Sequence, residues 1–481
     1  MAETMLRFVD VGRELPTKRA ASERVTDFNE VYAEYAAAKA AEQAARCSQC
    51  GVPFCQVHCP LSNNIPDWLK LTAEGRLEEA YHLSQATNPL PEICGRICPQ
   101  DRLCEGSCTI EQSDHGTVTI GAIERYLSDT AWNHGWVAPL TPAADRGQSV
   151  AIIGAGPAGL AAAETLRQRG YRVTVYDRHD RPGGLLTYGI PGFKLEKSVV
   201  QRRIERLKRG GIAFTLNFEV GRDASLEDLR ARHDAVFIAT GVYKARELKV
   251  PGVDLGHIVP ALDFLIASNR RGFGDQLPKA MDKGLDAHGK KVAVIGGGDT
   301  AMDCVRTAMR QGALSVSCLY RRDRDNMPGS LREVAHAEEE GVSFEWLTLP
   351  IAFQGTRNVE AVRLVRQRLG LADPAGRRTP EPISGSEFSL DVDLAISALG
   401  FDVEELPSLF SAPQLATRDN GTLRIVQKTM MTSIDGVFAG GDVVRGASLV
   451  VWAVRDGLDA AEAIDRFLLA RRASAGQLAA E

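Results

Sequence analysis

Two similar strand–loop–helix–strand units constrain the fold of this 481-residue chain more than any other feature. The first unit joins an apolar strand at 149–153 to Gly154-Ala155-Gly156-Pro157-Ala158-Gly159, an Ala-rich helix and a second strand at 172–176. The second unit joins a strand at 291–295 to Gly296-Gly297-Gly298-Asp299-Thr300-Ala301, a helix and a strand at 315–320. Strands that alternate with helices form parallel sheets whose ligands bind at the carboxyl ends of the strands. The pattern therefore predicts an α/β chain with two dinucleotide sites.

The first glycine loop has the features of a site for FAD or NAD. Gly154 allows a tight turn, Gly156 lets the backbone approach a pyrophosphate, and Gly159 lets the helix pack closely. The helix N-terminus, at Pro157 and Ala158, stabilises phosphate charge. Asp177 ends the second strand, where an acid accepts hydrogen bonds from the adenosine ribose and repels a 2′-phosphate. Glycines needed for packing alone would be the structural alternative.

The second loop favours NADP(H). Its predicted nucleotide contacts are Gly296, Gly298, Asp299 and Thr300, and Ala301 replaces the third glycine, which this motif tolerates. The following strand ends in Tyr320-Arg321-Arg322, with no acid at the ribose position. Two guanidinium groups there can hold a 2′-phosphate through charge-assisted hydrogen bonds. The alternative for Arg321 and Arg322 is a solvated charged patch.

Eight of the ten cysteines lie in two groups near the N-terminus. They are Cys47, Cys50, Cys55 and Cys59, then Cys94, Cys98, Cys104 and Cys108. Short, uneven spacings, with a Cys-Pro pair that closes the first group, are typical of ligands to iron–sulfur clusters, so we predict two [4Fe–4S] clusters. Zinc is the alternative metal, but zinc-ribbon proteins favour pairs of CxxC motifs. A third possibility is that the cysteines are structural thiols without a metal. Cys304 and Cys318 are predicted to be small buried hydrophobes, so neither glycine loop has a dithiol beside it.

The motifs divide the chain into three predicted domains: a mainly α-helical iron–sulfur domain at 1–145, an FAD domain at 146–250 plus 410–481, and an NADPH domain at 251–409. Both nucleotide domains are expected to be Rossmann-like. Within the first domain, helices are predicted at 31–46, 67–85 and 119–134. The formal charge of −5 argues against nucleic-acid binding. No apolar run approaches the ~20 residues of a membrane span, and the N-terminus has no secretory signal, so we expect a cytoplasmic protein without a membrane partner.

The order of four motifs resembles the two-dinucleotide-binding flavoprotein family. They are the first glycine loop, Ala239-Thr240-Gly241, the GGGDTA loop and Ala439-Gly440-Gly441-Asp442. That resemblance implies that Asp442 binds the ribityl and pyrophosphate part of FAD. It also implies a loop at 181–191 that runs under the flavin. The FAD contacts implied in addition to the first glycine loop are Gly183, Gly184, Leu185, Lys194, Thr240 and Gly441.

With its eight-cysteine segment, the chain resembles the small (β) subunits of NADPH-dependent glutamate synthase and the N-terminal half of dihydropyrimidine dehydrogenase. The segment at 23–32 resembles the glutamate synthase version. The resemblance implies that one cluster uses Cys47, Cys50, Cys55 and Cys108, and the other Cys59, Cys98, Cys104 and Glu124, with Cys94 a bystander. A simpler split into consecutive sets of four cysteines stays open.

The resemblance implies an NADPH-oxidising subunit. A hydride would pass from NADPH to FAD, and single electrons would pass through the clusters to a large (α) subunit that makes L-glutamate from L-glutamine and 2-oxoglutarate. Hydride transfer needs no acid or base from the protein, so we predict no catalytic proton-transfer residue. The alternatives are a free-standing NADPH:ferredoxin-type oxidoreductase, the flavin subunit of a pyrimidine reductase or bifurcating complex, and a non-catalytic scaffold.

Overall fold

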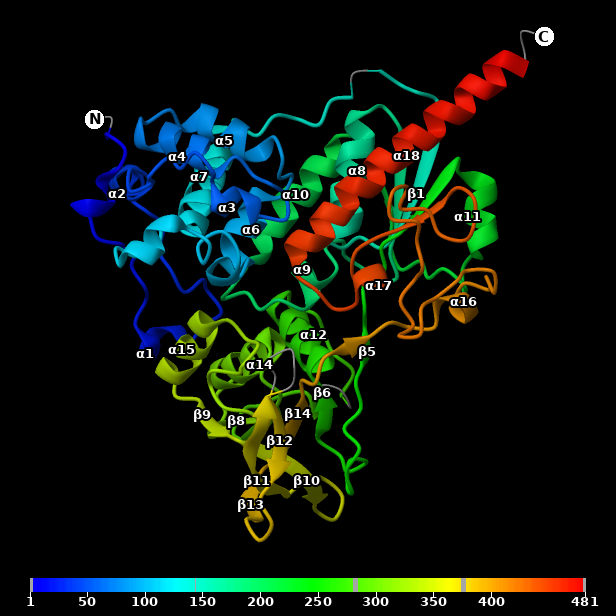
Figure 1. The fold of residues 1–481 in the computed structure, drawn as a ribbon. Coiled ribbons are helices and arrows are strands. Elements are labelled where there is room, and N and C mark those ends of the chain that lie inside the picture. The colour runs from blue at the N-terminus through cyan, green and yellow to red at the C-terminus, as the bar shows by residue number, and fades with distance from the viewer. Residues whose placement is uncertain (1–2, 143, 280–283, 373–377, 479–481) are drawn as a thin grey trace.

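The computed structural model describes residues 3–142, 144–279, 284–372 and 378–478. Figure 1 shows a helical N-terminal part and a first sheet-containing part side by side, with a second sheet-containing part below both. The predicted fold class is confirmed: two parallel sheets with flanking helices follow a mainly helical cysteine-bearing segment. No helix of the described residues is long and apolar enough to span a membrane.

The first parallel sheet has the strand order β16-β4-β1-β2-β3. Its strands are β1 (Ser149–Ile153), β2 (Arg172–Tyr176), β3 (Ala213–Thr215), β4 (Ala235–Ile238) and β16 (Val437–Ala439). Its helices are α8 (Pro157–Gln168), α9 (Leu185–Tyr188), α10 (Lys197–Arg209), α11 (Leu226–Arg232), α16 (Leu406–Leu409), α17 (Asp442–Arg445) and α18 (Val450–Leu478). Because β2 and β4 lie on opposite sides of β1, the glycine loop after β1 opens at the switch point where such folds bind ligands.

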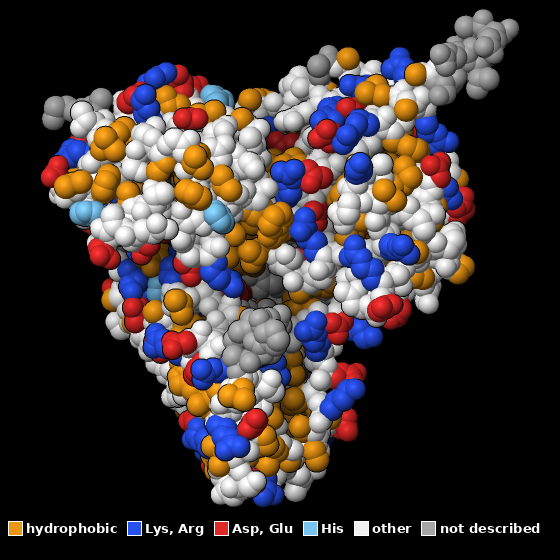
Figure 2. All heavy atoms as spheres, viewed as in Figure 1, with side chains coloured by type: hydrophobic (Ala, Val, Ile, Leu, Met, Phe, Trp, Pro, Cys, Tyr) orange, Lys and Arg blue, Asp and Glu red, His pale blue; other side chains and the backbone are white. Residues whose placement is uncertain are grey.

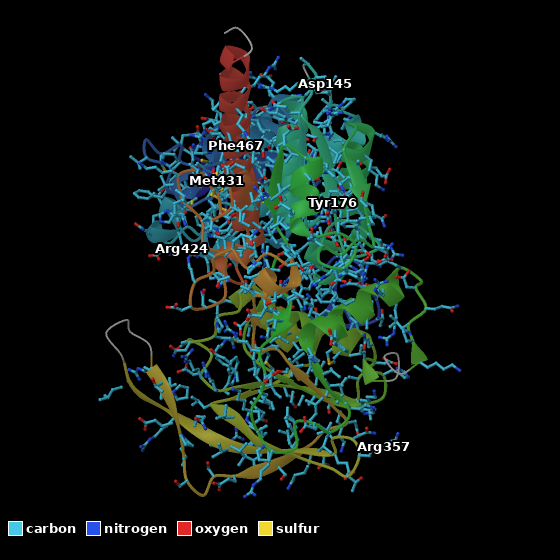
Figure 3. All side chains as sticks on the ribbon, turned by 90° about the vertical axis from the view of Figure 1, so that its right-hand side faces the viewer. Asp145, Tyr176, Arg357, Arg424, Met431 and Phe467 are labelled. Atoms are coloured by element: carbon cyan, nitrogen blue, oxygen red, sulfur yellow. The ribbon has the colours of Figure 1, made fainter. Side chains whose placement is uncertain are left out.

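The long helix α18 packs along α8 over this sheet and continues beyond the body of the protein (Figure 1). Gly457 permits the close approach, because a Cβ there would lie 2.3 Å from the carbonyl oxygen of Ala158. Further along α18, Phe467 contacts Phe438 of β16, with ring centroids 5.5 Å apart. Figure 3 shows Phe467 on α18 and Tyr176 at the end of β2, both in the upper part of the molecule.

The second parallel sheet has the equivalent order, β6-β14-β7-β8-β9. Its strands are β6 (Ile258–Pro260), β7 (Lys291–Ile295), β8 (Ser315–Tyr320), β9 (Ser343–Trp346) and β14 (Leu394–Ser397), with helices α12 (Ala261–Gly272), α14 (Asp299–Arg310) and α15 (Leu331–Glu339). An antiparallel sheet of β10 (Thr348–Gln354), β11 (Ala361–Ala372), β12 (Arg378–Pro382) and β13 (Phe388–Asp391) extends this part downward in Figure 1.

The chain passes between the two sheet-containing parts twice. It leaves the first part after β4 and returns to it after β14. The two connections pair as the short antiparallel strands β5 (Lys244–Ala245) and β15 (Phe401–Asp402). A narrow two-stranded connection of this kind does little to set the angle between two domains, so side-chain contacts must set it.

The N-terminal part consists of short helices. They are η1 (Arg7–Val9), α1 (Ala21–Arg24), α2 (Ala37–Ala44), α3 (Phe54–Val57), α4 (Ile65–Ala73), α5 (Leu77–Gln85), α6 (Pro91–Ile97), η2 (Gln100–Arg102), η3 (Thr109–Ser113) and α7 (Ile120–His134). The helix predicted at 31–46 is shorter than expected. Tyr32 forms a β-bridge with Lys18, and the Tyr35 hydroxyl donates to the carbonyl of Glu14, which keeps this stretch extended. The helix predicted at 67–85 is broken at Gly75, which has a φ of +78°.

A shared apolar cluster joins the N-terminal part to the first sheet-containing part. Leu61, Leu90 and Ile93 pack there against Val199 and Ile204 of α10. Beside the cluster, Arg203 on α10 forms a buried ion pair with Glu92 on α6, at 2.7 Å. The cysteine-bearing segment is thus packed onto the first dinucleotide domain.

On the outside, lysine and arginine side chains are interspersed with acidic ones over all three parts, as Figure 2 shows for one face.

Candidate functional site

The three glycines of the first loop have three different steric roles. Gly154 has a φ of +111°, and a Cβ there would lie 2.3 Å from the carbonyl oxygen of Ala239. A Cβ on Gly159 would lie 2.0 Å from the carbonyl oxygen of Gly154, so this glycine lets α8 pack against the loop. A Cβ on Gly156 would meet nothing within 4 Å. Gly156 therefore borders open space, as a backbone that approaches a pyrophosphate must.

A cavity lies beside this loop. The predicted residues that line it are Gly154, Gly156, Pro157, Ala158, Asp177, Gly184, Leu185, Thr240, Gly441 and Asp442. A second cavity also contacts Gly154, Asp177 and Thr240, so the two form an elongated space suited to a dinucleotide. The hydroxyl of Thr240 is buried without a hydrogen-bond partner among the described residues. This unpaired group and the open space at Gly156 both fit a bound ligand such as FAD.

Asp177 and the loop at 181–191 complete the cavity wall. The Asp177 carboxylate accepts hydrogen bonds from the backbone N–H groups of Ala155 (2.7 Å) and His179 (2.8 Å), which hold it at the end of β2. The Gly183 N–H donates to the carbonyl of Ala155 at 2.9 Å, so this loop lies directly on the glycine turn. Gly184 has a φ of +53°, and a Cβ there would lie 2.9 Å from the Gly156 Cα.

The structure places Lys194 elsewhere. Its ammonium group donates to the Asp303 carboxylate of α14 at 2.9 Å. It lines a different cavity, between the N-terminal part and the second dinucleotide domain. Phe193, the residue before it, likewise contacts α14, where its ring packs against the guanidinium groups of Arg306 and Arg310. Lys194 is therefore not among the residues that line the FAD-sized space.

Asp442 has a pKa of about 6, raised mainly by burial and also by the charge of Asp456. The folded pKa exceeds the usual value, so ionisation of Asp442 costs stability; the cost grows from about pH 4 to about pH 6 and is constant above that. We expect Asp442→Asn to raise the unfolding free energy of the ligand-free protein at pH 8 by up to about 3 kcal/mol. The gain should be about 1–2 kcal/mol smaller at pH 5, as denaturant titration at the two pH values would measure. A gain independent of pH would contradict this assignment.

The second glycine loop repeats the steric pattern. A Cβ on Gly296 would lie 2.3 Å from the carbonyl oxygen of Ala398, and one on Gly298 would meet nothing within 4 Å. The Tyr320 ring packs on Gly297, where a Cβ would lie 2.4 Å from the ring. The loop leads directly into α14, whose N-terminus begins at Asp299. The open space is again beside the glycine that precedes the helix.

Arg321 and Arg322 lie together just beyond β8, on the side that carries the second loop. Arg321 is exposed and makes no hydrogen bond or ion pair with the part of the chain that the structure describes. Arg322 is half-buried and donates to the carbonyl of Arg378, at 3.4 Å. Two guanidinium groups with spare donors at this position suit a phosphate on the ribose.

Asp299 has partners that the sequence did not indicate. Its carboxylate accepts from the backbone N–H of Ser330 at 2.9 Å and from Arg102 of the cysteine-bearing segment at 3.1 Å. Arg102 also donates to the carbonyl of Pro328, at 2.8 Å. The helical N-terminal part thus contacts the mouth of the second dinucleotide loop. Thr300, predicted for the same site, is the second residue of α14.

The structure brings Cys108 to the first group of cysteines. The Cys50 thiol and the hydroxyl of Thr109, the residue after Cys108, are 3.0 Å apart. The pKa of Cys55 is raised to about 12, mainly by burial and further by the neighbouring charges of Cys47, Cys108 and Cys50. Burial also raises the pKa of Cys47, to about 11. These four thiols therefore share one surrounding, although Cys108 is distant in sequence.

The remaining cysteines gather around Glu124. Burial raises the pKa of Cys59 to about 11, and the charges of Glu124 and Cys94 add to the effect. Cys98 lies beside Cys94, whose thiol donates to the Asn88 side-chain oxygen at 3.8 Å, and Cys104 lies near Cys59 and Glu124. Glu124 has a pKa of about 8, raised by burial, and accepts a hydrogen bond from Asn88 at 3.1 Å. This group holds four thiols and one carboxylate, one more than a four-iron cluster needs. Among the described residues, no three of these side chains converge as ligands of a single ion do.

Comparison with known proteins decides the family. Residues 24–136 match the family described as dihydropyrimidine dehydrogenase domain II, 4Fe-4S cluster, and residues 148–457 match the pyridine nucleotide–disulphide oxidoreductases. The chain is 63% identical over 479 residues to the glutamate synthase [NADPH] small chain of Azospirillum brasilense, covering 100% of this chain and 99% of that protein. The chain belongs to the glutamate synthase small-chain family. The protein of that name from Escherichia coli K12 is 46% identical, with 97% of this chain and 100% of that protein covered.

A solved structure shares the fold of the dinucleotide domains of this glutamate synthase small chain. The Mycobacterium tuberculosis protein FprA, in its complex with NADPH, matches 68% of this chain and 86% of its own, with a TM-score of 0.56 and 22% identity. A match at that identity establishes the fold of the two dinucleotide domains. The chain is thus an oxidoreductase of the pyridine nucleotide–disulphide type with an added 4Fe-4S domain.

Sequence reasoning missed two features of the site in this small chain. Tyr243 contacts both parts of the elongated cavity, and the guanidinium of Arg178 lies 4.7 Å from its ring centre. Residues 448–450 also line the cavity, at the start of α18. Neither segment belongs to a glycine motif, so no sequence pattern pointed to them.

Proposed function

We propose that this chain is the NADPH-oxidising electron-input subunit of a glutamate synthase. The observation that carries the proposal is the 63% identity, over 100% of this chain, to a protein named as the NADPH-dependent small chain. Two dinucleotide loops and a cysteine-rich segment packed on them support it. FAD would bind in the first domain, NADPH in the second, and two [4Fe–4S] clusters in the N-terminal domain.

The residues of the two loops have distinct tasks in this proposal. The backbone at Gly156 and the N-terminus of α8 would hold the pyrophosphate of FAD, and Asp177 would accept hydrogen bonds from its ribose. Asp442 and Thr240 would hold the ribityl chain. Bound flavin exchanges a hydride with a nicotinamide and single electrons with iron–sulfur centres. The protein itself needs to orient the two rings and exclude water, so no acid or base is assigned.

The thiol neighbourhoods support the crossed arrangement of cluster ligands. The first cluster would be held by Cys47, Cys50, Cys55 and Cys108, and the second by Cys59, Cys98, Cys104 and Glu124. Cys94 would be a bystander beside the ligand Cys98, with its thiol donating to Asn88. The Thr109 contact with Cys50 favours this arrangement over a split into consecutive sets of four cysteines.

The electrons would leave the chain for a large subunit that makes L-glutamate from L-glutamine and 2-oxoglutarate. The test is anaerobic affinity purification from the native cell, with mass spectrometry of the stoichiometric partners. We expect one large chain to co-purify, and the complex to form glutamate only when NADPH is supplied. A chain that purifies alone and passes NADPH electrons to ferredoxin would instead be a free-standing reductase.

Replacing both Arg321 and Arg322 by alanine should raise the KM for NADPH by about 100-fold or more and change the KM for NADH less than about threefold. The reason is that each charge-assisted hydrogen bond to the 2′-phosphate contributes about 1.5–3 kcal/mol, and NADH lacks that phosphate. Steady-state reduction of an artificial acceptor by each nucleotide measures the two values. Arg324→Ala is the control, because Arg324 pairs with Glu338 and lies outside the predicted site. Equal effects on both nucleotides would refute the assignment.

A further inference from the structure

The loop that leads from α9 to α10 extends from the first dinucleotide domain into the second. Lys194 near its end forms an ion pair with Asp303 on α14 at 2.9 Å, and its ammonium lies 3.8 Å from Glu333 on α15. The Lys194 side chain is only 14% exposed and that of Asp303 only 10%. Burial opposes the ammonium charge, yet the attraction of the two carboxylates raises the pKa of Lys194 above its usual range. Burial raises the pKa of Asp303 to about 6, so above that pH the pair is charged, buried and shared between two domains.

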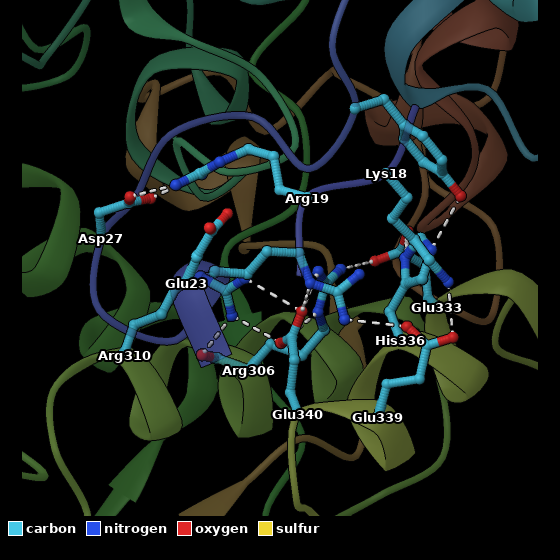
Figure 4. Close-up of polar contacts among 12 residues, drawn as sticks. Lys18, Arg19, Glu23, Asp27, Arg306, Arg310, Glu333, His336, Glu339 and Glu340 are labelled. Atoms are coloured by element: carbon cyan, nitrogen blue, oxygen red, sulfur yellow. Dashed lines mark hydrogen bonds and ion pairs between the residues drawn. The ribbon is translucent and has the colours of Figure 1, made fainter. Parts of the chain in front are cut away.

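Glu333, one of the two carboxylates that face Lys194, belongs to a buried ion-pair network in the second domain (Figure 4). Arg306 on α14 pairs with Glu333 at 2.5 Å and with Glu340 at 2.8 Å. Arg310 and Arg24 also contact Glu340, at 2.6 and 3.4 Å. Because these groups are almost fully buried and constrain one another, the network holds the Glu333 carboxylate in place beside Lys194.

Phe193, beside Lys194, makes the apolar half of the same contact. The guanidinium carbons of Arg306 and Arg310 lie 4.5 and 3.9 Å from the centre of its ring. Phe28 of the N-terminal segment contacts its ring too, with ring centroids 6.3 Å apart. Phe193 and Lys194 together thus hold the loop against the second domain, at the point where all three parts of the protein meet.

Each partner of the Lys194–Asp303 pair belongs to a segment that also borders a dinucleotide site. Leu185, in the same loop, lines the first cavity. Asp303 lies about one helical turn after Asp299, where α14 begins beside the open space at Gly298. The paired connections β5 and β15 are exposed: the Arg246–Asp402 ion pair there has side chains 56% and 50% exposed. Exposed pairs of that kind contribute little, so the buried Lys194–Asp303 contact constrains the angle between the domains more than this connection does. It acts together with contacts to α12, where Asn269 donates to the carbonyl of Tyr188 at 2.9 Å and Arg270 pairs with Asp180 at 2.8 Å.

We propose that Lys194 is a positioning residue for hydride transfer: its buried ion pair with Asp303 holds the NADPH-binding domain at the angle that brings the nicotinamide to the flavin. The inference rests on the proposed transfer from NADPH to flavin. A misplacement of about 1 Å between reacting groups lowers a rate by about 100-fold, even when binding is unchanged. Loss of the pair should therefore slow the reaction without weakening NADPH binding.

The test is stopped-flow reduction of the flavin by NADPH in the full-length holoenzyme. For Lys194→Met we expect the limiting rate of flavin bleaching to fall about 10- to 100-fold, with the apparent Kd for NADPH within about threefold of wild type. Lys194→Arg should recover most of the rate, because arginine retains the charge. Lys291→Met is the matched control, since Lys291 pairs with Asp391 on the surface of the same domain, and its rate should be unchanged.

Lys194→Met leaves Asp303 buried without its partner and can cost stability. The double variant Lys194→Met/Asp303→Leu removes both charges, and the same fall in rate is expected from it. A wild-type rate in either variant would overturn the inference, and so would a rise in Kd without a fall in rate. Failure of NADPH to bleach the flavin of the wild-type protein would instead overturn the proposed function.

Discussion

Replacing Gly156 by valine should produce a folded protein that retains no flavin. A Cβ at this position meets nothing within 4 Å, so the new side chain enters the open space beside the loop and not the protein core. That space is the proposed position of the FAD pyrophosphate. Inserting atoms into a filled site costs about 1–3 kcal/mol or more, so we expect at least a 10- to 100-fold loss of FAD affinity. Flavin absorbance after dialysis, together with circular dichroism, measures both results.

Gly159→Val is the matched control for this prediction. A Cβ at Gly159 would lie 2.0 Å from the carbonyl oxygen of Gly154, so valine there must displace α8 from the loop. We expect it to lower the melting temperature of the apoprotein, whereas Gly156→Val should leave that temperature nearly unchanged. If Gly156→Val kept its flavin, the space beside Gly156 would not be the cofactor site.

Cys98→Ala should remove one of two iron–sulfur clusters, and Cys94→Ala should remove neither. The two thiols are close neighbours near Glu124, so their surroundings are closely matched. In the proposed arrangement only Cys98 binds iron. We expect the Cys98 variant to lose about half of its iron, because four of eight irons belong to each of two [4Fe–4S] clusters.

The same variant separates the two halves of the reaction. NADPH should still bleach the flavin of Cys98→Ala, whereas electron delivery to the large subunit should fall at least about 100-fold, because one cluster of the chain is missing. Iron analysis, electron paramagnetic resonance and glutamate formation by the reconstituted complex measure these outcomes. If Cys94→Ala lost iron and Cys98→Ala kept all of it, Cys94 would be the cluster ligand and Cys98 the bystander.

The strands beside the glycine loops could be predicted from the sequence to the residue. β1, β2, β7 and β8 have the predicted bounds. Each is a short apolar run in a unit of about 30 residues, so local pattern and local packing agree. The helix predicted at 31–46 shows the limit of this reasoning. Its sequence has high helix propensity, but Tyr35 binds the carbonyl of Glu14, and this distant contact outweighs the local preference.

The features of the candidate sites also separate into those that follow from local sequence and those that depend on distant contacts. The sequence by itself determined the two dinucleotide loops, because the glycines and acids that shape each loop lie within one strand–helix–strand unit. Only the tertiary structure decided that Cys108 lies with the first cysteine group and that Lys194 meets Asp303 instead of the first cavity. Tyr243 lies outside any motif, and Arg102 lies between two predicted cluster ligands, where the cysteine pattern gives no sign of a contact with the second domain. These contacts depend on how separate domains pack, and a pattern of neighbouring residues holds no information about a partner that lies a hundred residues away.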